Sequence, residues 1–313
     1  MQHSALFVGS FNPAAAAAIR GWLAAGHRVV AFWRGLTPTA GPVHRDRRLS
    51  VIAPRWSVAA AAREHRFPVR DVPRLSSWPE AEKKVRATGA DVLISTYFPF
   101  LIPKDILEIF GPRAVNFHPA PLPRYRGPSP VQAMILDRTV LTDGAMTLHV
   151  LSPELDEGPI VARQPVPFPE DLNIGRYALA LAQAARKLAG DSLPRYLAGD
   201  LRTAPQDASA ATYVRVMKTD LELSPRLSAG DILWRCRTFG KDRTLAIAGL
   251  DRVRVTGFAG ILGPPTSMPP AIRPLSVDFD VADARIRLWR KLPLTRHLQR
   301  LRALLLLAGT PIA

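Results

Sequence analysis

The residues most able to do chemistry form the short stretch Val115-Asn116-Phe117-His118-Pro119. Side chains two positions apart on a strand point to the same face, so Asn116 and His118 would project together. An amide N–H can stabilise the oxyanion that develops in acyl transfer, and an imidazole can accept or relay a proton near neutral pH. An isolated histidine is more often structural, but the adjacent asparagine and the stiff loop that follows, with five prolines between positions 119 and 130, favour catalysis.

A carboxylate that could complete this set is Asp156, in the turn 151–160 between two expected strands. An acidic residue in a loop is usually solvated. Here Leu155 and Ile160 make the turn half-apolar, so we expect a partly buried Asp156 paired with His118. Pairing would raise the pKa of the histidine, whereas burial alone would lower it.

The elements that must position these residues follow an alternating pattern. An apolar strand over 5–11, an Ala-rich helix over 14–25 and a strand over 27–33 form a βαβ start, which predicts a parallel sheet covered by helices. Further strands are expected at 91–96 and 114–117. In open α/β sheets ligands bind at the carboxyl ends of the strands, which is where Asn116 and His118 would lie. The first turn has Gly9 without a Gly-x-Gly-x-x-Gly pattern, so NAD is not indicated.

The rest of the chain divides into further elements. Strands are expected at 145–151 and 159–168, the second antiparallel, with helices at 173–188 and 193–197. A polar linker over 200–211 precedes a small β-rich unit with strands near 244–248 and 252–256, and the proline-rich segment 263–274 is interpreted as a second linker. We therefore expect a catalytic domain at 1–203, a small domain at 204–263, and a linker with a tail at 264–313.

Composition excludes several classes of protein. At about 150 residues per domain, 313 residues suggest two domains, and 47% hydrophobic with 22% charged residues is ordinary globular usage. The single cysteine, Cys236, excludes an intrachain disulfide framework and multi-cysteine metal sites. The N-terminus lacks a basic signal-peptide region, and no uncharged apolar run reaches the ~18 residues of a spanning helix, which predicts a cytoplasmic protein.

The chain is strongly basic, with a formal net charge of +16. Such an excess favours anionic partners, although it is equally explained by solubility and an arginine-rich bias. Residues 284–308 carry seven of the Lys and Arg residues and no acid. From Thr295 onward a leucine stripe predicts a basic amphipathic helix, which would contact an anionic membrane or a nucleic acid, or dock on the body of the protein or a partner subunit.

The stretch VNFHPAPLPRYRGPSPVQAMI, followed by TDGAMTLHVLSPELDEGPIVARQPVPF, resembles the 10-formyltetrahydrofolate-dependent formyltransferases. This family includes enzymes that formylate methionyl-tRNA, glycinamide ribonucleotide and sugar nucleotides. Its signature is Asn-x-His, then Leu-Pro-x-x-x-Gly, then an Asp-x-Gly, all in this order here. The resemblance covers about residues 5–200 and, more weakly, 210–257. It implies a Rossmann-like α/β fold with a mostly parallel sheet and a small β-rich C-terminal domain. The basic helical tail expected after this domain is indicated by its own residues and not by the resemblance.

Carried over position by position, the resemblance implies that Asn116, His118 and Asp156 are catalytic. Asn116 and a protonated His118 would stabilise the oxyanion, and Asp156 would orient and charge His118. The co-substrate is 10-formyltetrahydrofolate, and no metal is expected. The residues implied to bind its folate moiety are Tyr97, Phe98, Pro99, Phe100, Leu101, Ile102, Leu151 and Leu155. The implied substrate loop is Arg124, Tyr125, Arg126 and Gly127.

The formyl acceptor implied by the resemblance is a primary amine. A small molecule such as an amino-sugar nucleotide or an amino acid is favoured, because residues 35–48 lack the Pro-Asp-Arg-Pro-x-Gly-Arg-Gly pattern of methionyl-tRNA formyltransferases. Methionyl-tRNA remains the alternative that the net charge favours. Two other hypotheses are a hydrolase of the formyl donor and a catalytically silent protein that binds folate or RNA.

Overall fold

The computed structural model describes residues 1–36, 50–166, 168, 174–239 and 245–291, and the statements below concern these residues. The chain separates into two compact units. The first comprises the described parts of 1–167 and 178–214, and the second comprises those of 168–177 and 215–306. The expected 35–48 loop and the expected helix after Thr295 lie largely or wholly outside the described residues.

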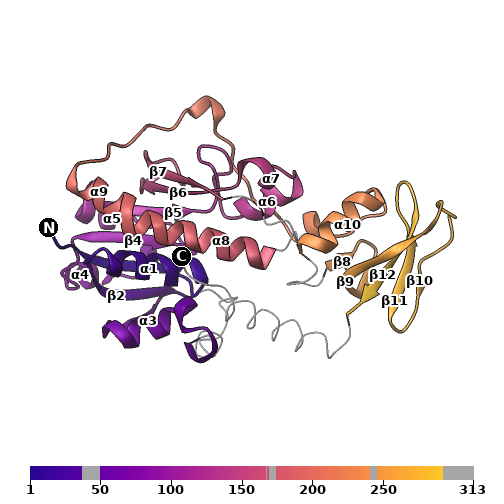
Figure 1. Cartoon of the computed structure of the whole chain (residues 1–313), viewed down its shortest axis with the longest axis horizontal. Coiled ribbons are helices and arrows are strands. Elements are labelled where there is room, and N and C mark those ends of the chain that lie inside the picture. Colours follow the sequence, from indigo (N-terminus) through magenta and orange to yellow (C-terminus); the bar gives the residue numbers. More distant parts are fainter. Residues whose placement is uncertain (37–49, 167, 169–173, 240–244, 292–313) are drawn as a thin grey trace. The chain divides into compact units, whose positions relative to one another are not determined.

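The first unit is built on a seven-stranded sheet of order β3-β2-β1-β4-β5-β6-β7 (Figure 1). The five strands β1 to β5 are parallel, and β6 and β7 are antiparallel to their neighbours. The strands are β1 Ser4–Gly9, β2 Arg28–Gly35, β3 Val69–Val72, β4 Val92–Thr96, β5 Ala114–His118, β6 Ala145–Val150 and β7 Ile160–Pro165. The expected mostly parallel α/β sheet is confirmed.

Helices cover both faces of this sheet (Figure 1). Leu6 and Val8 belong to one apolar cluster with residues of α4 and α5, while the alternate residues Ala5 and Phe7 are equally buried. Burial of both faces explains why the central strands β1 and β4 are nearly continuous apolar runs. The α-helices are α1 Pro13–Ala24, α3 Val58–His65, α4 Ala81–Arg86, α5 Lys104–Phe110, α6 Pro130–Leu136, α7 Val140–Asp143, α8 Ile174–Lys187 and α9 Leu193–Ala198.

Helix α1 shows how the sequence determines close packing. Pro13 occupies its first turn, and the side chain of Asn12 caps it by accepting a 2.9 Å hydrogen bond from the Ala15 N–H. At Gly21 a Cβ atom would lie 2.2 Å from the Arg186 carbonyl oxygen at the end of α8. Only glycine therefore permits this approach of the two backbones.

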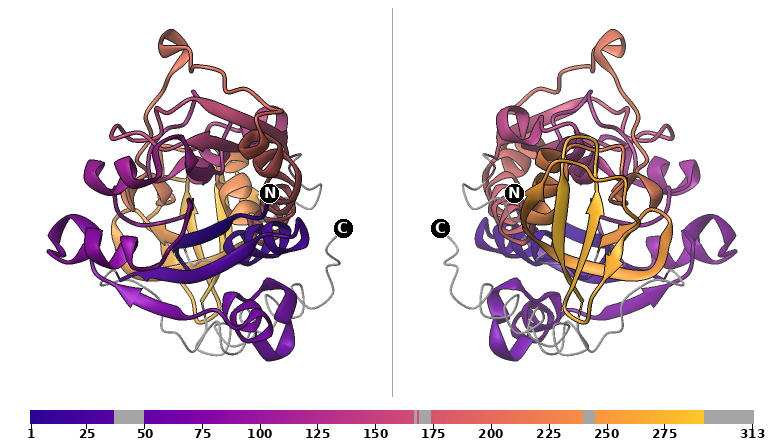
Figure 2. Two further views of the ribbon diagram at one scale, coloured as in Figure 1. Left: turned by 90° about the vertical axis from the view of Figure 1, so that its left-hand side faces the viewer. Right: turned by 90° about the vertical axis from the view of Figure 1, so that its right-hand side faces the viewer.

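The second unit contains helix α10 (Ala229–Thr238) and a five-stranded antiparallel sheet of order β10-β11-β12-β9-β8 (Figure 2, right). Its strands are β8 Leu245–Ile247, β9 Leu250–Gly263, β10 Ala271–Ile272, β11 Ser276–Asp280 and β12 Arg285–Arg290. The expected small β-rich unit is thus present, and it is larger than expected.

The interpretation of residues 264–291 as a linker and the start of a helical tail is wrong. This segment supplies β10, β11 and β12, because Ile286 and Leu288 alternate with polar residues at the period of a strand and are fully buried. Arg285 and Arg287, two cations of the expected anion-binding tail, form ion pairs with Asp280 (2.9 Å) and Asp278 (2.6 Å).

The boundary expected after residue 203 also differs. Residues 204–214, expected to begin the second domain, group with the first unit and hydrogen-bond to its loops. The Ala204 N–H and carbonyl both bond to Ile160 at 2.8 Å, and the Val214 N–H donates to the Arg126 carbonyl at 2.7 Å. Backbone pairing across the sheet edge therefore makes this polar stretch part of the first unit.

We expect Gly21→Ala to destabilise the first unit by about 1–3 kcal/mol, because the added methyl group has no room between the two backbones. Gly230→Ala on α10 is the matched control, since the nearest atom to its added Cβ is the Ser228 hydroxyl at 3.7 Å. Urea unfolding of both variants measures the difference. Equal effects of the two substitutions would contradict this account of the packing.

Candidate active site

The site begins at the carboxyl end of β5. Asn116 and His118 project from one face of this strand and are 9% and 4% exposed, while Val115 and Phe117 are buried on the other face. Strand β6 runs antiparallel beside β5 and places His149 directly opposite Asn116, and Thr147 opposite His118. Because directly opposed side chains share a face, His149 joins the two expected residues.

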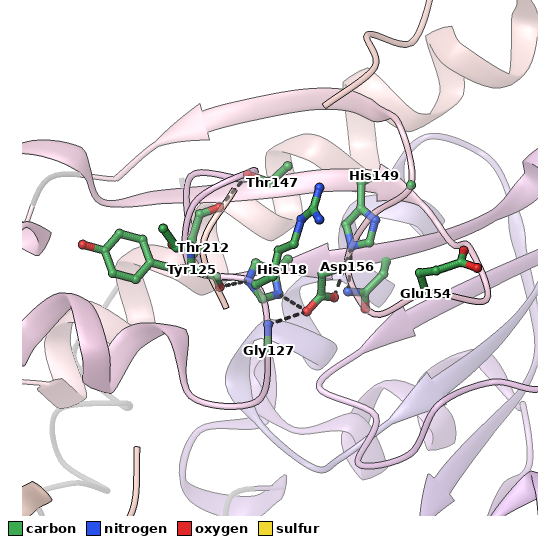
Figure 3. A network of polar contacts seen from close by, with 12 residues as sticks. His118, Tyr125, Gly127, Thr147, His149, Glu154, Asp156 and Thr212 are labelled. Atoms are coloured by element: carbon green, nitrogen blue, oxygen red, sulfur yellow. Dashed lines mark hydrogen bonds and ion pairs between the residues drawn. The ribbon is translucent and has the colours of Figure 1, made fainter. Parts of the chain in front are cut away.

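Asp156 lies in the loop between β6 and β7 and is 8% exposed (Figure 3). Its Oδ2 accepts a 2.9 Å hydrogen bond from the Gly127 N–H and lies 3.5 Å from His118 Nδ1. Its Oδ1 lies 3.7 Å from His149 Nε2. The loop therefore brings the carboxylate between two imidazole rings and beside the end of the proline-rich loop.

The backbone around the site adopts costly conformations. Asp156, Tyr125 and Tyr97 have positive φ angles of 59°, 64° and 52°. Each non-glycine residue in this region costs on the order of 1 kcal/mol or more and persists only where its surroundings hold it. Three of the loops expected to form the site are thus held by tertiary contacts.

His118 is oriented by the proline-rich loop. Its Nε2 lies 2.8 Å from the Tyr125 carbonyl oxygen, so Nε2 carries the proton, and in the neutral ring Nδ1 presents its lone pair toward Asp156. Burial lowers the pKa of His118 below its ordinary value, although Asp156 and the Tyr125 carbonyl oppose this effect. Of the two opposing effects expected on this pKa, burial is therefore larger than the pairing with Asp156.

His149 is a site residue that sequence reasoning missed. Its Nδ1 donates to the Val150 carbonyl at 2.9 Å, which leaves Nε2 to accept a hydrogen bond from the Asn116 amide at 3.1 Å. Complete burial lowers its pKa from 6.5 to about 4, so the ring is neutral at pH 7. Its signal in the sequence was a lone histidine on an apolar strand, two residues after Thr147.

The expected substrate loop holds the site together. The Tyr125 N–H donates to the Thr212 hydroxyl at 2.8 Å, and its own hydroxyl donates to Asp137 at 2.8 Å. The Arg124 guanidinium forms a 2.8 Å ion pair with Asp143.

The end of this loop is held closely by the backbone of residue 214. Gly127 has a φ of 109°, and a Cβ there would lie 2.5 Å from the Val214 carbonyl oxygen. The Arg126 guanidinium contacts Glu157 at 3.0 Å.

The residues expected to bind folate fall into two places. Phe98 and Leu151 pack, half-buried, against the apolar cluster that contains Ile102. Phe100 meets Phe98 edge-to-face, and Leu101 is 57% exposed. Exposed Tyr97 and Pro99 complete this run. Leu155 instead lines a cavity of about 360 Å³ beside Asp156. The other lining residues are Arg126, Glu157, Ala211, Thr212 and Tyr213.

Within the described ranges, no cluster of three or more His, Cys, Asp or Glu residues is arranged to hold a metal ion. In the same residues, no helix has the length and apolar character needed to cross a membrane.

Comparison with known proteins decides the family. A sequence model described as "Formyl transferase" matches residues 57–193, which include Asn116, His118 and Asp156. The chain belongs to the formyl transferase family. The methionyl-tRNA formyltransferase of Chloroflexus aggregans is 34% identical over 198 residues, 63% of this chain and 61% of that protein. The enzyme of Chloroflexus aurantiacus is 33% identical over 69% of this chain and 66% of its own length. The matched stretch of this chain thus spans less than two thirds of the length of each of these relatives.

Several solved structures share the fold of this chain. An N-formyltransferase from Helicobacter canadensis, solved with folinic acid and dTDP-3-aminofucose, superposes with a TM-score of 0.62 over 93% of this chain and 100% of its own, at 13% identity. HypX from Aquifex aeolicus gives a TM-score of 0.62 at 15% identity, over 100% of this chain and 49% of its own. At these identities the similarity concerns the fold alone.

The depressed pKa of His149 makes stability depend on pH. Between pH 6.5 and about 4 the unfolded chain binds a proton that the folded ring rejects, so the free energy of unfolding falls as the pH falls through this range. The contribution of this one ring is up to about 3 kcal/mol. Urea unfolding between pH 7 and 4.5 should show a shallower pH dependence for His149→Gln than for the wild type. His65→Gln, at a half-exposed ring, is the control, and an unchanged slope in His149→Gln would contradict the assignment.

Proposed function

We propose that the protein transfers the formyl group of 10-formyltetrahydrofolate to the nitrogen of a primary amine, and that the acceptor is a small molecule. The observation that carries the proposal is the convergence of Asn116, His118 and Asp156 at the end of β5. An amide donor, an imidazole and a carboxylate are the groups that direct acyl transfer to an amine requires.

The reaction joins the acceptor nitrogen to the formyl carbon and breaks the bond from that carbon to N10 of the donor. The attacking amine loses one proton, and N10 of the departing tetrahydrofolate gains one. The protein must therefore stabilise negative charge on the formyl oxygen and move one proton between two nitrogens.

Asn116 is suited to the formyl oxygen. One of its amide hydrogens is directed to His149 Nε2, which fixes the plane of the amide and leaves the second hydrogen for a substrate oxygen. Because His149 is neutral, it accepts this hydrogen bond at neutral pH. A donor that is held in place before reaction stabilises the transition state without reorganisation.

His118 and Asp156 are suited to the proton transfer. In the neutral ring the free lone pair is on Nδ1, 3.5 Å from Asp156 Oδ2, a separation longer than an ordinary hydrogen bond. As the amine attacks, Nδ1 takes its proton, and the imidazolium that forms is paired with Asp156. The same ring then returns the proton to N10 of the leaving tetrahydrofolate.

The half-exposed apolar run at Tyr97–Ile102, with Leu151 beside it, is suited to a flat pterin, which binds in apolar slots with a few polar contacts. The cavity of about 360 Å³ is a separate place, lined by Leu155 and Glu157, the two neighbours of Asp156 in the chain. Its size suits a small-molecule acceptor or part of one. Tyr213, 58% exposed, offers an aromatic face there.

Methionyl-tRNA is the second candidate acceptor. It is supported by the names of the relatives that are 31–34% identical and by the net charge of +16. A tRNA held by several phosphate contacts would lose affinity steeply with salt, whereas a small amine would not.

We expect Asn116→Ala to lower kcat by about 100- to 1,000-fold, as for loss of one oxyanion donor, with a smaller change in the KM of the formyl donor. Steady-state release of tetrahydrofolate measures both constants. Gln164→Ala is the control, since Gln164 lies on β7 of the same sheet and donates to the neighbouring Pro165 carbonyl. A variant that retained wild-type kcat would remove Asn116 from the mechanism.

The acceptor is tested by measuring tetrahydrofolate release from 10-formyltetrahydrofolate without an acceptor, and then with methionyl-tRNA, amino-sugar nucleotides and free amino acids. We expect release that depends on one small amine and is little affected by salt. Dependence on methionyl-tRNA with a steep salt response would identify the second candidate. Fast release without any amine would instead indicate a hydrolase, and folate binding without release would indicate a binding protein.

A further inference from the structure

A segment outside the signature motifs crosses the active-site loops of the first unit. We call residues 204–214 the strap. At one end Ala204 pairs with Ile160 at the start of β7, through two 2.8 Å backbone hydrogen bonds. At the other end the strap pairs with Arg126, whose N–H donates to the Thr212 carbonyl at 2.8 Å. The strap thus joins the loop that carries Asp156 to the loop that orients His118.

Between these two ends the side chain of Gln206 makes four hydrogen bonds. Its Oε1 accepts from Arg126 Nε (3.1 Å) and Nη2 (2.9 Å). Its Nε2 donates to the backbone carbonyls of Asp156 (2.8 Å) and Gly158 (2.7 Å). The orientation of the amide follows from its partners, because a guanidinium can only donate and a backbone carbonyl can only accept.

These contacts act on the part of the Asp156 loop that is least stable by itself. Asp156 has a φ of 59°, and rotation of the peptide that follows it would remove its carbonyl from Gln206. The same residue presents Oδ2 to the Gly127 N–H, one position after Arg126. Gln206 therefore bonds to the backbone carbonyl of Asp156 and also to Arg126, the residue before Gly127, whose N–H donates to the Asp156 carboxylate.

From this arrangement we infer that Gln206 is a positioning residue: its amide clips together the Asp156 loop and the Arg126 loop and so sets the distance between the Asp156 carboxylate and His118 Nδ1. Only the expected effect of Gln206 on the rate of formyl transfer rests on the proposed function. The amide of Gln206 bonds to backbone carbonyls and to the Arg126 guanidinium. Its effect on the reaction therefore passes through the position of Asp156. Sequence reasoning placed this residue in a linker.

The direct test is the NMR titration of the His118 ring in histidine-labelled full-length protein, with the His118→Gln variant used to assign the signal. The groups that face this ring are Asp156, His149 and the Tyr125 carbonyl. We expect Gln206→Ala to change the pKa of His118, because it releases Asp156, and Gln164→Ala to leave it unchanged. In an Asp156→Asn background the same Gln206→Ala substitution should have no effect, since the charge it positions is gone.

Catalysis provides a second readout. We expect Gln206→Ala and Gln206→Glu to lower kcat by about 10- to 100-fold, with little change in the KM of the formyl donor, as misplacement of a catalytic group does. The glutamate variant keeps the size of the side chain and its bond to Arg126 but removes both donors to the Asp156 loop. It therefore distinguishes loss of the hydrogen bonds to this loop from loss of side-chain packing.

The outcomes distinguish the two proposals. A His118 pKa that Gln206→Ala does not change, or that changes equally in the Asp156→Asn background, overturns the positioning role. Absence of formyl transfer to every amine tested, with the pKa coupling present, overturns the proposed function and leaves the positioning role supported.

Discussion

The buried carboxylate of Asp156 is the constraint on which the active site depends. Removing a carboxylate from water is costly unless hydrogen bonds and nearby groups replace the solvent. Here the Gly127 N–H donates to it, and two imidazole rings lie within 4 Å. To supply those partners, the β6–β7 loop, the proline-rich loop and the end of β5 must all meet at one point. The positive φ angles of Asp156 and Tyr125 are part of the cost of that convergence.

One carboxylate between two histidines produces two different roles because the rings have different partners. His149 gives its one hydrogen to a backbone carbonyl and is fully buried, so it stays neutral and accepts from Asn116. His118 gives its hydrogen to the Tyr125 carbonyl and turns its lone pair toward the carboxylate. The first ring fixes the orientation of the Asn116 amide, while the second presents an unprotonated nitrogen toward the carboxylate.

Family membership and the geometry of the site concern different stretches of the chain. The matched region, 57–193, contains the groups that would handle the formyl carbon and the proton. The cavity beside Asp156 is lined partly by Ala211, Thr212 and Tyr213, which lie beyond that region. Part of the wall of this cavity is therefore supplied by residues outside the stretch that contains Asn116, His118 and Asp156.

The sequence by itself determined the α/β class, most strands of the first unit and the shared face of Asn116 and His118, because these depend on local periodicity and on a contiguous signature. Tertiary structure alone decided that His149 faces Asn116 and that Gln206 reaches Asp156, contacts between residues 33 and 50 positions apart. It also decided that burial outweighs Asp156 in setting the pKa of His118, and that residues 276–290 complete a sheet. Strand pairing, burial and loop convergence depend on contacts between residues far apart in the chain, which local patterns of residues do not specify.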